Sequence, residues 1–273
     1  MLQFSVDESR CTRCGLCAKD CVAYVIRQGG KRLPTIAPEH EPRCLRCQHC
    51  LAICPTGAIS ILGKSPTDSQ PIVPENLPSF DELATLVRGR RSVRQYKQEN
   101  VDAELLSRLL TTLQYAPTGA NALGLTFTVI DDLAVMQRFQ QQMIALIRES
   151  ASSNNLPERY LPMLEFPDAK LIVRLFRTAP HAIIVSAPPT VTTPGEDTAV
   201  AIANFELLAR SAGLGSVWWG FLRFFTNMVP AIKTLLGIPE DHILSAALFG
   251  YPAVQYARTV QRDDVAVIKR VSL

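Results

Sequence analysis

Long apolar runs are missing from this chain of 273 residues. The longest stretch without a charged residue covers residues 109–130, and polar residues, glycines and a proline interrupt it. A membrane-spanning helix needs about 18 or more consecutive apolar residues, so we expect no membrane span and no membrane partner. The N-terminal residues also lack a basic segment followed by an apolar one. We therefore expect no secretion signal and a cytoplasmic location.

An excess of one charge is missing too. The chain has 28 Lys and Arg residues against 25 Asp and Glu residues, for a net charge of +3. Such a balance gives no reason to expect a nucleic-acid partner. Hydrophobic residues make up 47% and charged residues 19% of the chain, which excludes a disordered or fibrous protein. The length is sufficient for about two domains.

Cysteine is absent after Cys54, although eight cysteines lie between Cys11 and Cys54. A disulfide framework would suit a small secreted domain, whereas C-x-x-C steps in a chain expected to be cytoplasmic favour metal binding. The histidines have no metal-ligand spacing, and we interpret them as incidental, with a proton donor at His181 as a minor alternative. They are His40, His49, His181 and His242.

The cysteines form two runs of identical spacing, Cys11-x2-Cys14-x2-Cys17-x3-Cys21 and Cys44-x2-Cys47-x2-Cys50-x3-Cys54. This doubled spacing resembles that of bacterial two-cluster ferredoxins. The resemblance implies two [4Fe–4S] clusters, in which the fourth cysteine of each run binds the other cluster. The implied ligand sets are Cys11, Cys14, Cys17 and Cys54 for one cluster, and Cys44, Cys47, Cys50 and Cys21 for the other.

Zinc is the alternative for these cysteines. A four-cysteine zinc site uses two C-x2-C pairs, however, and leaves the third and fourth cysteine of each run without a purpose. One departure from the ferredoxin pattern is that Val22 follows Cys21, where Pro55 follows Cys54. That change affects the local turn and not the number of ligands.

Composition changes after the cysteine runs. Residues 63–78 contain four prolines among polar residues, which predicts an extended linker between a domain of residues 1–62 and a domain of residues 79–273. A capping-box pattern at Ser79 and Glu82 opens a helix to about residue 88. Apolar spacing predicts helices at 102–115, 133–147 and 198–212, and strands at 126–130, 182–185, 243–249 and 265–271. Residues 150–180 have no clear pattern. Helices and strands without strict alternation favour an α+β fold.

Three segments of the second domain have weak chemical signals when each is taken alone. Arg90-Arg91-Ser92-Val93-Arg94 fits either a phosphate clamp or a solvated basic helix end. Pro117-Thr118-Gly119-Ala120-Asn121 indicates a loop. Gly213-Leu214-Gly215-Ser216-Val217-Trp218-Trp219-Gly220 indicates a buried turn from a helix to a strand, and its glycines do not match a dinucleotide fingerprint.

In this order, with the third segment extended back through residues 205–212 (FELLARSA) and with the late Gly250-Tyr251-Pro252-Ala253, the three segments resemble the nitroreductase family of flavoproteins from about residue 80 onward. The whole chain resembles ferredoxin–nitroreductase fusion proteins. The resemblance implies an α+β homodimer with FMN at the subunit interface. It places Arg90, Arg91 and Ser92 at the phosphate and ribityl end, and Arg94 at the pyrimidine edge, where a cation stabilises the reduced ring.

The same resemblance implies further contacts to FMN. It assigns Pro117, Thr118, Gly119 and Asn121 to the partner subunit's side of the flavin, backbone amides near Trp219 and Gly220 to the ring, and Arg262 rather than Arg258 to the phosphate. No side chain is assigned as catalytic, because N5 of the flavin does the chemistry. Two departures stand out: residues 123–125 replace a frequent Gln-Pro-aromatic sequence, and Trp218 either narrows the pocket or fills the core.

These observations predict an FMN-dependent oxidoreductase whose clusters relay electrons to the flavin. The expected acceptor is a small planar molecule, such as a nitroaromatic, a quinone or an enone, and the external donor is reduced ferredoxin or NAD(P)H. One alternative is an enzyme that takes electrons directly from NAD(P)H and uses the clusters for export. The other is a non-catalytic electron carrier or redox sensor. An open apolar pocket over the flavin would favour an enzyme, and a covered flavin would favour a relay.

Overall fold

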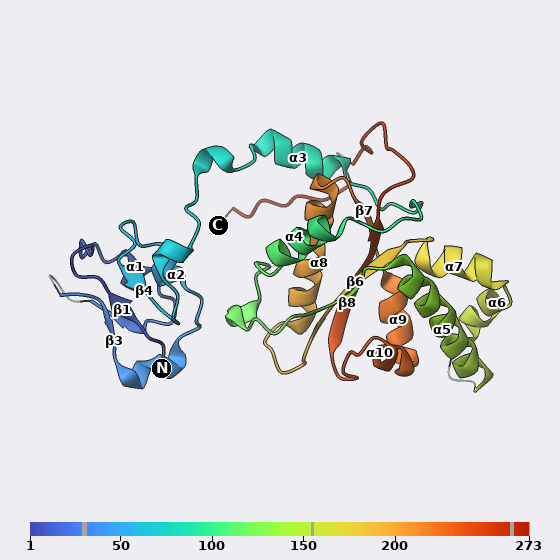
Figure 1. The fold of residues 1–273 in the computed structure, drawn as a ribbon, viewed down its shortest axis with the longest axis horizontal. Helices are drawn as coiled ribbons and strands as arrows, with labels where there is room; N and C mark the ends of the chain where they lie inside the picture. Colours follow the sequence, from blue (N-terminus) through green and yellow to red (C-terminus); the bar gives the residue numbers. More distant parts are fainter. Residues whose placement is uncertain (29–31, 154–155, 263–264, 273) are drawn as a thin grey trace. The chain divides into compact units, whose positions relative to one another are not determined.

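In the computed structural model, which describes residues 1–28, 32–153, 156–262 and 265–272, the chain divides into two units. One unit comprises Met1–Pro78 with Ala120–Ala122, and the other comprises Ser79–Gly119 with Leu123–Leu273 (Figure 1). Each unit is described by itself below. In the part of the chain that the structure describes, no helix has both the length and the apolar character needed to cross a membrane.

The first unit combines short strands, short helices and a small core. Its strands pair antiparallel, β1 (Ser5–Val6) with β4 (Ile59–Ser60) and β2 (Ile26–Arg27) with β3 (Thr35–Ile36). The helices α1 (Leu16–Lys19) and α2 (His49–Ala52) each begin inside a cysteine run. One short 3-10 turn, Pro38–Arg43, precedes α2, and two more follow β4, at Pro66–Asp68 and Pro74–Asn76. The core includes Leu2, Val25, Leu51, Ile59 and Ile61, all at most 5% exposed.

The two cysteine runs repeat one pattern of backbone turns. Two positions within each run, and a third position three residues after its last cysteine, adopt left-handed backbone conformations. The pairs are Arg13 (φ 59°) with Arg46 (φ 54°), Gly15 (φ 78°) with Gln48 (φ 59°), and Tyr24 (φ 53°) with Gly57 (φ 58°). The sequence repeat is therefore also a structural repeat. Glycine, which this conformation favours, occurs in only one member of each of the last two pairs, Gly15 and Gly57.

The second unit is built on a four-stranded antiparallel sheet in the order β5-β6-β8-β7. Its strands are β5 (Thr126–Ile130), β6 (His181–Ala187), β7 (Gly215–Trp218) and β8 (Ile243–Gly250). Its α-helices are α3 (Phe80–Gly89), α4 (Ala103–Leu113), α5 (Leu133–Ser152), α6 (Leu161–Leu164), α7 (Asp168–Phe176), α8 (Pro194–Ser211), α9 (Gly220–Met228) and α10 (Ala231–Leu235). This arrangement confirms the α+β class.

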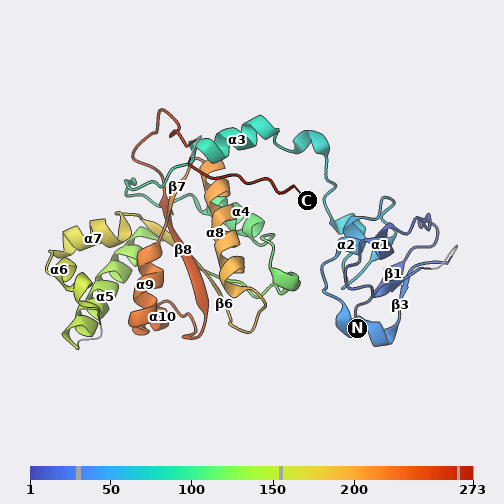
Figure 2. The same cartoon turned by 180° about the vertical axis from the view of Figure 1, so that it is seen from behind.

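Helices cover both faces of the sheet. Along β6, Ala182 and Ile184 face a core that also contains residues of α5, α7, α9 and α10. Ile183 and Val185 face the opposite core, together with residues of α4 and α8. Successive strand residues point to opposite faces, so every residue of β6 is buried on one side or the other. The two views show the same three layers (Figures 1 and 2).

Most predicted elements of the second unit are confirmed. The Ser79–Glu82 capping box opens α3, Asp102 caps α4, and β5 has the predicted bounds. The helix predicted at 133–147 continues to Ser152, and residues 150–180 contain the 3-10 turn Glu158–Tyr160, α6 and α7.

The strand predicted at 265–271 is wrong. Of these residues, the structure describes no strand, and the apolar side chains are 77–85% exposed; they are Val265, Val267, Ile268 and Val271. An apolar pattern forms a strand only where another strand supplies the hydrogen bonds of a ladder, and no strand of the described sheet pairs with this segment.

Candidate functional site

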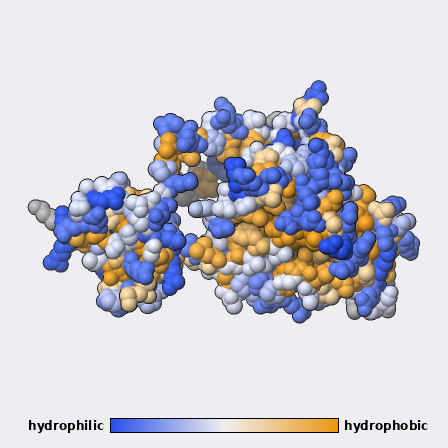
Figure 3. Space-filling model, in the orientation of Figure 1, coloured by the Kyte–Doolittle hydropathy of each residue, from blue (hydrophilic) through white to orange (hydrophobic). Residues whose placement is uncertain are grey.

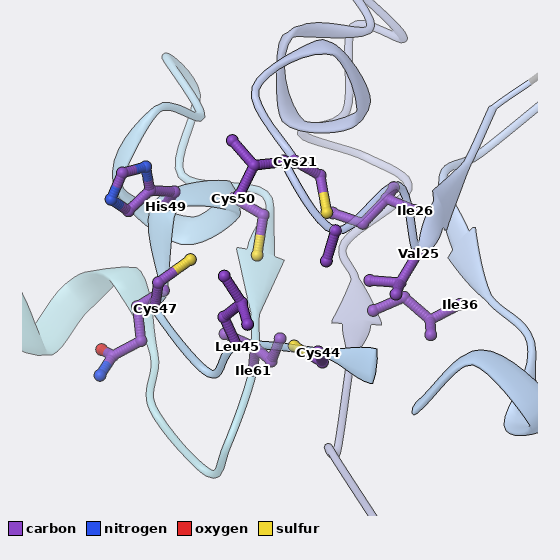
Figure 4. A pocket seen from close by; sticks show the side chains of 13 residues that line it. Cys21, Val25, Ile26, Ile36, Cys44, Leu45, Cys47, His49, Cys50 and Ile61 are labelled. Carbon is purple, nitrogen blue, oxygen red and sulfur yellow. The ribbon is translucent and has the colours of Figure 1, made fainter. Parts of the chain in front are cut away.

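The last cysteine of each run lines the pocket formed by the first three cysteines of the other run. One pocket of the first unit is lined by Cys21 together with Cys44, Cys47 and Cys50. Their sulfur atoms surround one space in Figure 4. A second pocket is lined by Cys11, Cys14, Cys17 and Cys54. The two groups are the ligand sets that the ferredoxin resemblance implied.

The left-handed residues shape these pockets. They turn the chain tightly between successive cysteines, and such turns point backbone N–H groups into a concave site that suits anions, including iron–sulfur clusters. The Arg46 N–H lies 3.4 Å from Cys44 Sγ, and the Ala58 N–H donates to Cys54 Sγ at 3.2 Å. The loops therefore offer donors to bound thiolates.

Burial changes the acidity of several thiols. It raises the pKa of the Cys50 thiol to about 12 and also raises the pKa of the Cys17 thiol. Burial has the same tendency at Cys54, but hydrogen bonds from Ala58 and Thr56 outweigh it and lower the pKa of that thiol. Since metal-bound thiols are deprotonated, cluster assembly must displace protons from the buried cysteines.

Four thiols line each pocket, and four cysteine thiolates are the ligands of a [4Fe–4S] cluster. In residues 1–28, 32–153, 156–262 and 265–272, no group of three or more His, Cys, Asp or Glu side chains is arranged so that it could hold a metal ion.

The second unit contains an open cavity of about 520 Å³, a size typical of small-molecule sites. One wall is the stretch Val217–Phe221, and Ser92 and Arg94 line the cavity beside it. The remaining lining residues are Tyr160, Leu175, Arg177, Phe224 and Leu248. The cavity thus combines aromatic surface, two hydroxyl groups and two guanidinium groups.

The N-terminus of α9 opens into this cavity, since Gly220 and Phe221 both line it. The first N–H groups of a helix have no partner within the helix and carry partial positive charge. The Trp219 N–H is already committed to the Ala246 carbonyl at 2.7 Å, and its side chain is buried with Nε1 donating to the Leu175 carbonyl. The amides of Gly220 and Phe221, and not that of Trp219, are therefore the ones at this helix end that a ligand in the cavity could use.

The segment 90–94 faces two sites. Val93 N–H donates to the Ser216 carbonyl at 2.9 Å, which fixes the segment beside β7. Ser92 and Arg94 line the cavity, whereas Arg90 and Arg91 line a neighbouring pocket. Arg210 and Glu206 of α8 also line that pocket. We call Arg90, Arg91 and Arg210 the arginine cluster; with one carboxylate for three guanidiniums, it retains positive charge that suits a phosphate.

Glu206 connects the arginine cluster with the cavity wall. Its side chain is 5% exposed, and one carboxylate oxygen lies 3.5 Å from Arg90 Nη1. The other oxygen accepts a hydrogen bond from Trp218 Nε1 at 2.6 Å. Trp218 is 43% exposed and lines the cavity. Of the two possibilities for Trp218, the structure therefore shows a pocket wall and not core packing.

The loop predicted to contact FMN lies elsewhere in the chain's own fold. Gly119 N–H donates to the buried Asp197 at 2.8 Å, and Thr118 lines a separate pocket with residues such as Leu125 and Phe127. None of the described residues Pro117, Thr118, Gly119 and Asn121 lines the cavity. Arg262 and Arg258 are exposed and line neither the cavity nor the pocket of the arginine cluster.

Arg177 of the cavity belongs to no motif, and only the fold brings it beside Ser92, Arg94 and the start of α9. Glu206 and Arg210 of the neighbouring pocket lie in the stretch 205–220 that carries the family resemblance, but the resemblance assigned them no role. His181, the minor candidate for a proton donor, is fully buried, and its Nε2 accepts the Val101 N–H at 3.0 Å. Its position indicates a structural role.

Comparison with known proteins assigns both units. The sequence model of the nitroreductase family matches residues 87–251, and the model of a 4Fe-4S dicluster domain matches residues 10–59. An Archaeoglobus fulgidus protein named "Putative NADH dehydrogenase/NAD(P)H nitroreductase" is 25% identical over 179 residues, covering 63% of this chain and 87% of the relative. Human iodotyrosine deiodinase 1 is 28% identical over 194 residues, covering 66% of this chain and 64% of the relative.

Solved structures show the same fold. A crystal structure of a nitroreductase with bound FMN from Bacteroides fragilis has a TM-score of 0.55 at 25% identity, covering 69% of this chain and 99% of that one. A nitroreductase with bound FMN from Desulfitobacterium hafniense has a TM-score of 0.52 at 22% identity, covering 68% of this chain and 97% of that one. The nitroreductase match alone spans more than half of the sequence. The chain therefore belongs to the nitroreductase family, as an oxidoreductase in which a 4Fe–4S dicluster ferredoxin domain precedes the nitroreductase domain.

Proposed function

We propose that this protein is an FMN-dependent oxidoreductase in which two [4Fe–4S] clusters relay electrons to FMN for the reduction of a small, planar organic acceptor. Nitroaromatics, quinones and enones are the acceptor classes. The observation that carries the proposal is the presence, on one chain, of two four-cysteine pockets and an open cavity lined by Ser92, Arg94 and the start of α9.

The two cysteine groups support two clusters per chain. Cys11, Cys14, Cys17 and Cys54 would hold one, and Cys21, Cys44, Cys47 and Cys50 the other. Each group has four thiols, which is the complement of a [4Fe–4S] cluster. The domains meet, on this proposal, through a linker at residues 63–78, with the ferredoxin domain at 1–62 and the flavin domain at 79–273.

Residues from both parts of the segment 90–94 would hold FMN. The arginine cluster and Ser92 would bind the phosphate and ribityl end, and Arg94 would lie at the pyrimidine edge. The amides of Gly220 and Phe221 would face the ring. The nitroreductase from Bacteroides fragilis crystallised with bound FMN supports FMN as the group that this domain holds. Bound there, FMN would exchange single electrons with the clusters and pass two to the acceptor.

A homodimer would complete the site. Pro117, Thr118, Gly119 and Asn121 would contact the FMN held by the other subunit, which accords with the fact that none of them lines the cavity of its own chain. Broad apolar areas are visible on the second unit in Figure 3. Exposed apolar side chains of this unit include Tyr115 at 87% and Leu123 at 63%, and large apolar patches mark association surfaces.

NAD(P)H as the direct electron donor is the second candidate. The names of the archaeal relatives from Archaeoglobus fulgidus and Methanothermobacter thermautotrophicus include NAD(P)H nitroreductase activity, which favours this candidate.

Anaerobic stopped-flow reduction distinguishes the two donors. The full chain, loaded with iron, sulfide and FMN, is mixed either with reduced ferredoxin or with NAD(P)H, and flavin bleaching is followed. On our proposal ferredoxin reduces the flavin rapidly, and Cys14→Ala slows that reduction without loss of FMN. Rapid bleaching by NAD(P)H that is unaffected by Cys14→Ala would favour the second candidate. Iron analysis should give about eight irons and eight sulfides per chain, and stoichiometric zinc would refute the relay.

Sedimentation tests the dimer. The FMN-loaded protein should sediment as a dimer, and Asn121→Ala should weaken FMN binding. An FMN-loaded monomer would contradict the proposed subunit interface.

A further inference from the structure

One guanidinium in the cavity remains after the residues that would hold FMN are assigned. Arg94 is placed at the flavin ring and the arginine cluster at the phosphate, whereas Arg177 lines the same cavity with no role. We propose that Arg177 binds an anionic group of the acceptor, so that the preferred substrates are aromatic acids. This inference rests on the proposed function and specifies the substrate class of its cavity.

The backbone holds Arg177 in an unusual conformation. Arg177 is the residue at the C-terminal end of α7, with φ 53° and ψ 24°, and Thr178 follows with φ 55°. Two successive residues that are not glycine thus adopt the left-handed region, which costs energy and is concentrated at functional sites. The Thr178 carbonyl accepts a hydrogen bond from Gln98 Nε2 at 2.8 Å, and the Ala179 N–H donates to the Phe176 carbonyl at 2.9 Å. These bonds fix the turn.

The charge of Arg177 has no counterpart nearby. The residues that line the cavity include no Asp or Glu, and no ion pair of Arg177 occurs among the described residues. The side chain is half-buried. A guanidinium that is partly removed from water and has no carboxylate beside it favours an anionic ligand, and its planar fork matches a carboxylate.

The rest of the lining favours an aromatic body for that ligand. Tyr160 and Phe224 lie with ring centroids 4.3 Å apart, and Trp218 and Phe221 add further aromatic surface to the cavity. Flat rings bind such surface by offset or edge-to-face contacts. An acceptor with a flat ring and a carboxylate would use both features, whereas a neutral acceptor would leave Arg177 unpaired.

Paired probes of equal shape test the inference. The FMN-loaded, oxidised full chain is titrated with 4-nitrobenzoate or with the neutral 4-nitrobenzamide, and binding is followed through the change in flavin absorbance. We expect the wild type to bind the benzoate about tenfold or more tightly than the amide, since a hydrogen bond to a charged group contributes on this scale. Arg177→Ala should remove this preference and leave the affinity for the amide and for FMN unchanged.

Two further variants serve as controls. Arg177→Lys should restore part of the preference, because it keeps the charge without the fork. Arg174→Ala removes an exposed arginine of the same helix that does not line the cavity, and it should behave as the wild type. Equal affinity for the two probes, no binding of either, or an unchanged preference in Arg177→Ala would overturn the inference. Loss of FMN in Arg177→Ala would make Arg177 a cofactor ligand. Failure of the wild type to bind FMN would instead refute the proposed function itself.

Discussion

Replacing Glu206 by alanine should destabilise the nitroreductase domain and loosen one wall of its cavity. The carboxylate is 5% exposed and serves two partners at once, Trp218 Nε1 at 2.6 Å and Arg90 Nη1 at 3.5 Å. Without it, the indole N–H loses its acceptor and the guanidinium of Arg90 loses its counter-charge. Both partners belong to surfaces that we assign to binding, so the loss should affect stability and ligand affinity together.

The two contacts differ in their expected energies. A buried hydrogen bond to a charged group contributes about 1.5–3 kcal/mol. The ion pair contributes less, about 0–1 kcal/mol, because the Arg90 side chain is 39% exposed and water screens it. We therefore expect Glu206→Ala to lower the free energy of unfolding by about 2–3 kcal/mol. For a domain of this size, that change lowers Tm by about 4–12 °C.

Urea and thermal unfolding followed by tryptophan fluorescence measure the effect. Glu206→Gln should lose less, about 1 kcal/mol, because its amide oxygen still accepts from Trp218 while the charge beside Arg90 disappears. Glu149→Ala removes an exposed glutamate of α5 and provides the matched control. If Glu206→Ala unfolds at the same urea concentration and temperature as Glu149→Ala, the coupling of Arg90 and Trp218 through this carboxylate is refuted.

Three further predictions concern other parts of the chain. Cys21→Ala and Cys47→Ala should lose the same cluster and leave the same residual EPR spectrum after reduction; a Cys21→Ala spectrum that instead matches that of Cys14→Ala would exclude the crossed ligand sets. Arg94→Ala should lower the flavin potential by about 30–65 mV, measured by spectroelectrochemical titration, with Arg94→Lys recovering part of the shift. Burial lowers the pKa of His181 below its ordinary value of 6.5. The stability contributed by its neutral form is therefore fully present above pH 6.5, and it is lost as the pH falls from 6.5 through the lowered pKa. In urea unfolding at about pH 7.5 and about pH 5, His181→Gln should therefore show a smaller loss of stability in acid than the wild type.

Local patterns in the sequence account for the parts that were predicted well. The capping box at Ser79, the start of a helix at about residue 102 and the strand at 126–130 depend on neighbouring residues, and the structure has them as predicted. The ferredoxin resemblance, which rests on cysteine spacing, likewise implies two groups of four cysteines. One of these groups lines each of the two pockets in the first unit, and their binding of clusters stays a prediction.

The parts that the sequence did not predict depend on distant segments. Glu206 meets Arg90 and Trp218 only because α8 lies beside β7 and the segment 90–94. Arg177 reaches the cavity through the turn after α7, and no motif surrounds it. The strand expected at 265–271 failed for the same reason, since apolar spacing is local and strand pairing is not.

The exchange of fourth cysteines has a consequence for how the N-terminal domain comes into being. A fragment that ends between Cys21 and Cys44 would contain three thiols of one site and a single thiol of the other. Neither this fragment nor the remainder of the N-terminal domain can therefore supply all four thiols of a site by itself. Because metal binding and folding are coupled in small metal-dependent domains, the two halves depend on each other for maturation. On the proposed ligand sets, loss of one cluster leaves a cysteine of the other site's run without its metal, and we expect the N-terminal domain to fold and unfold as one cooperative unit.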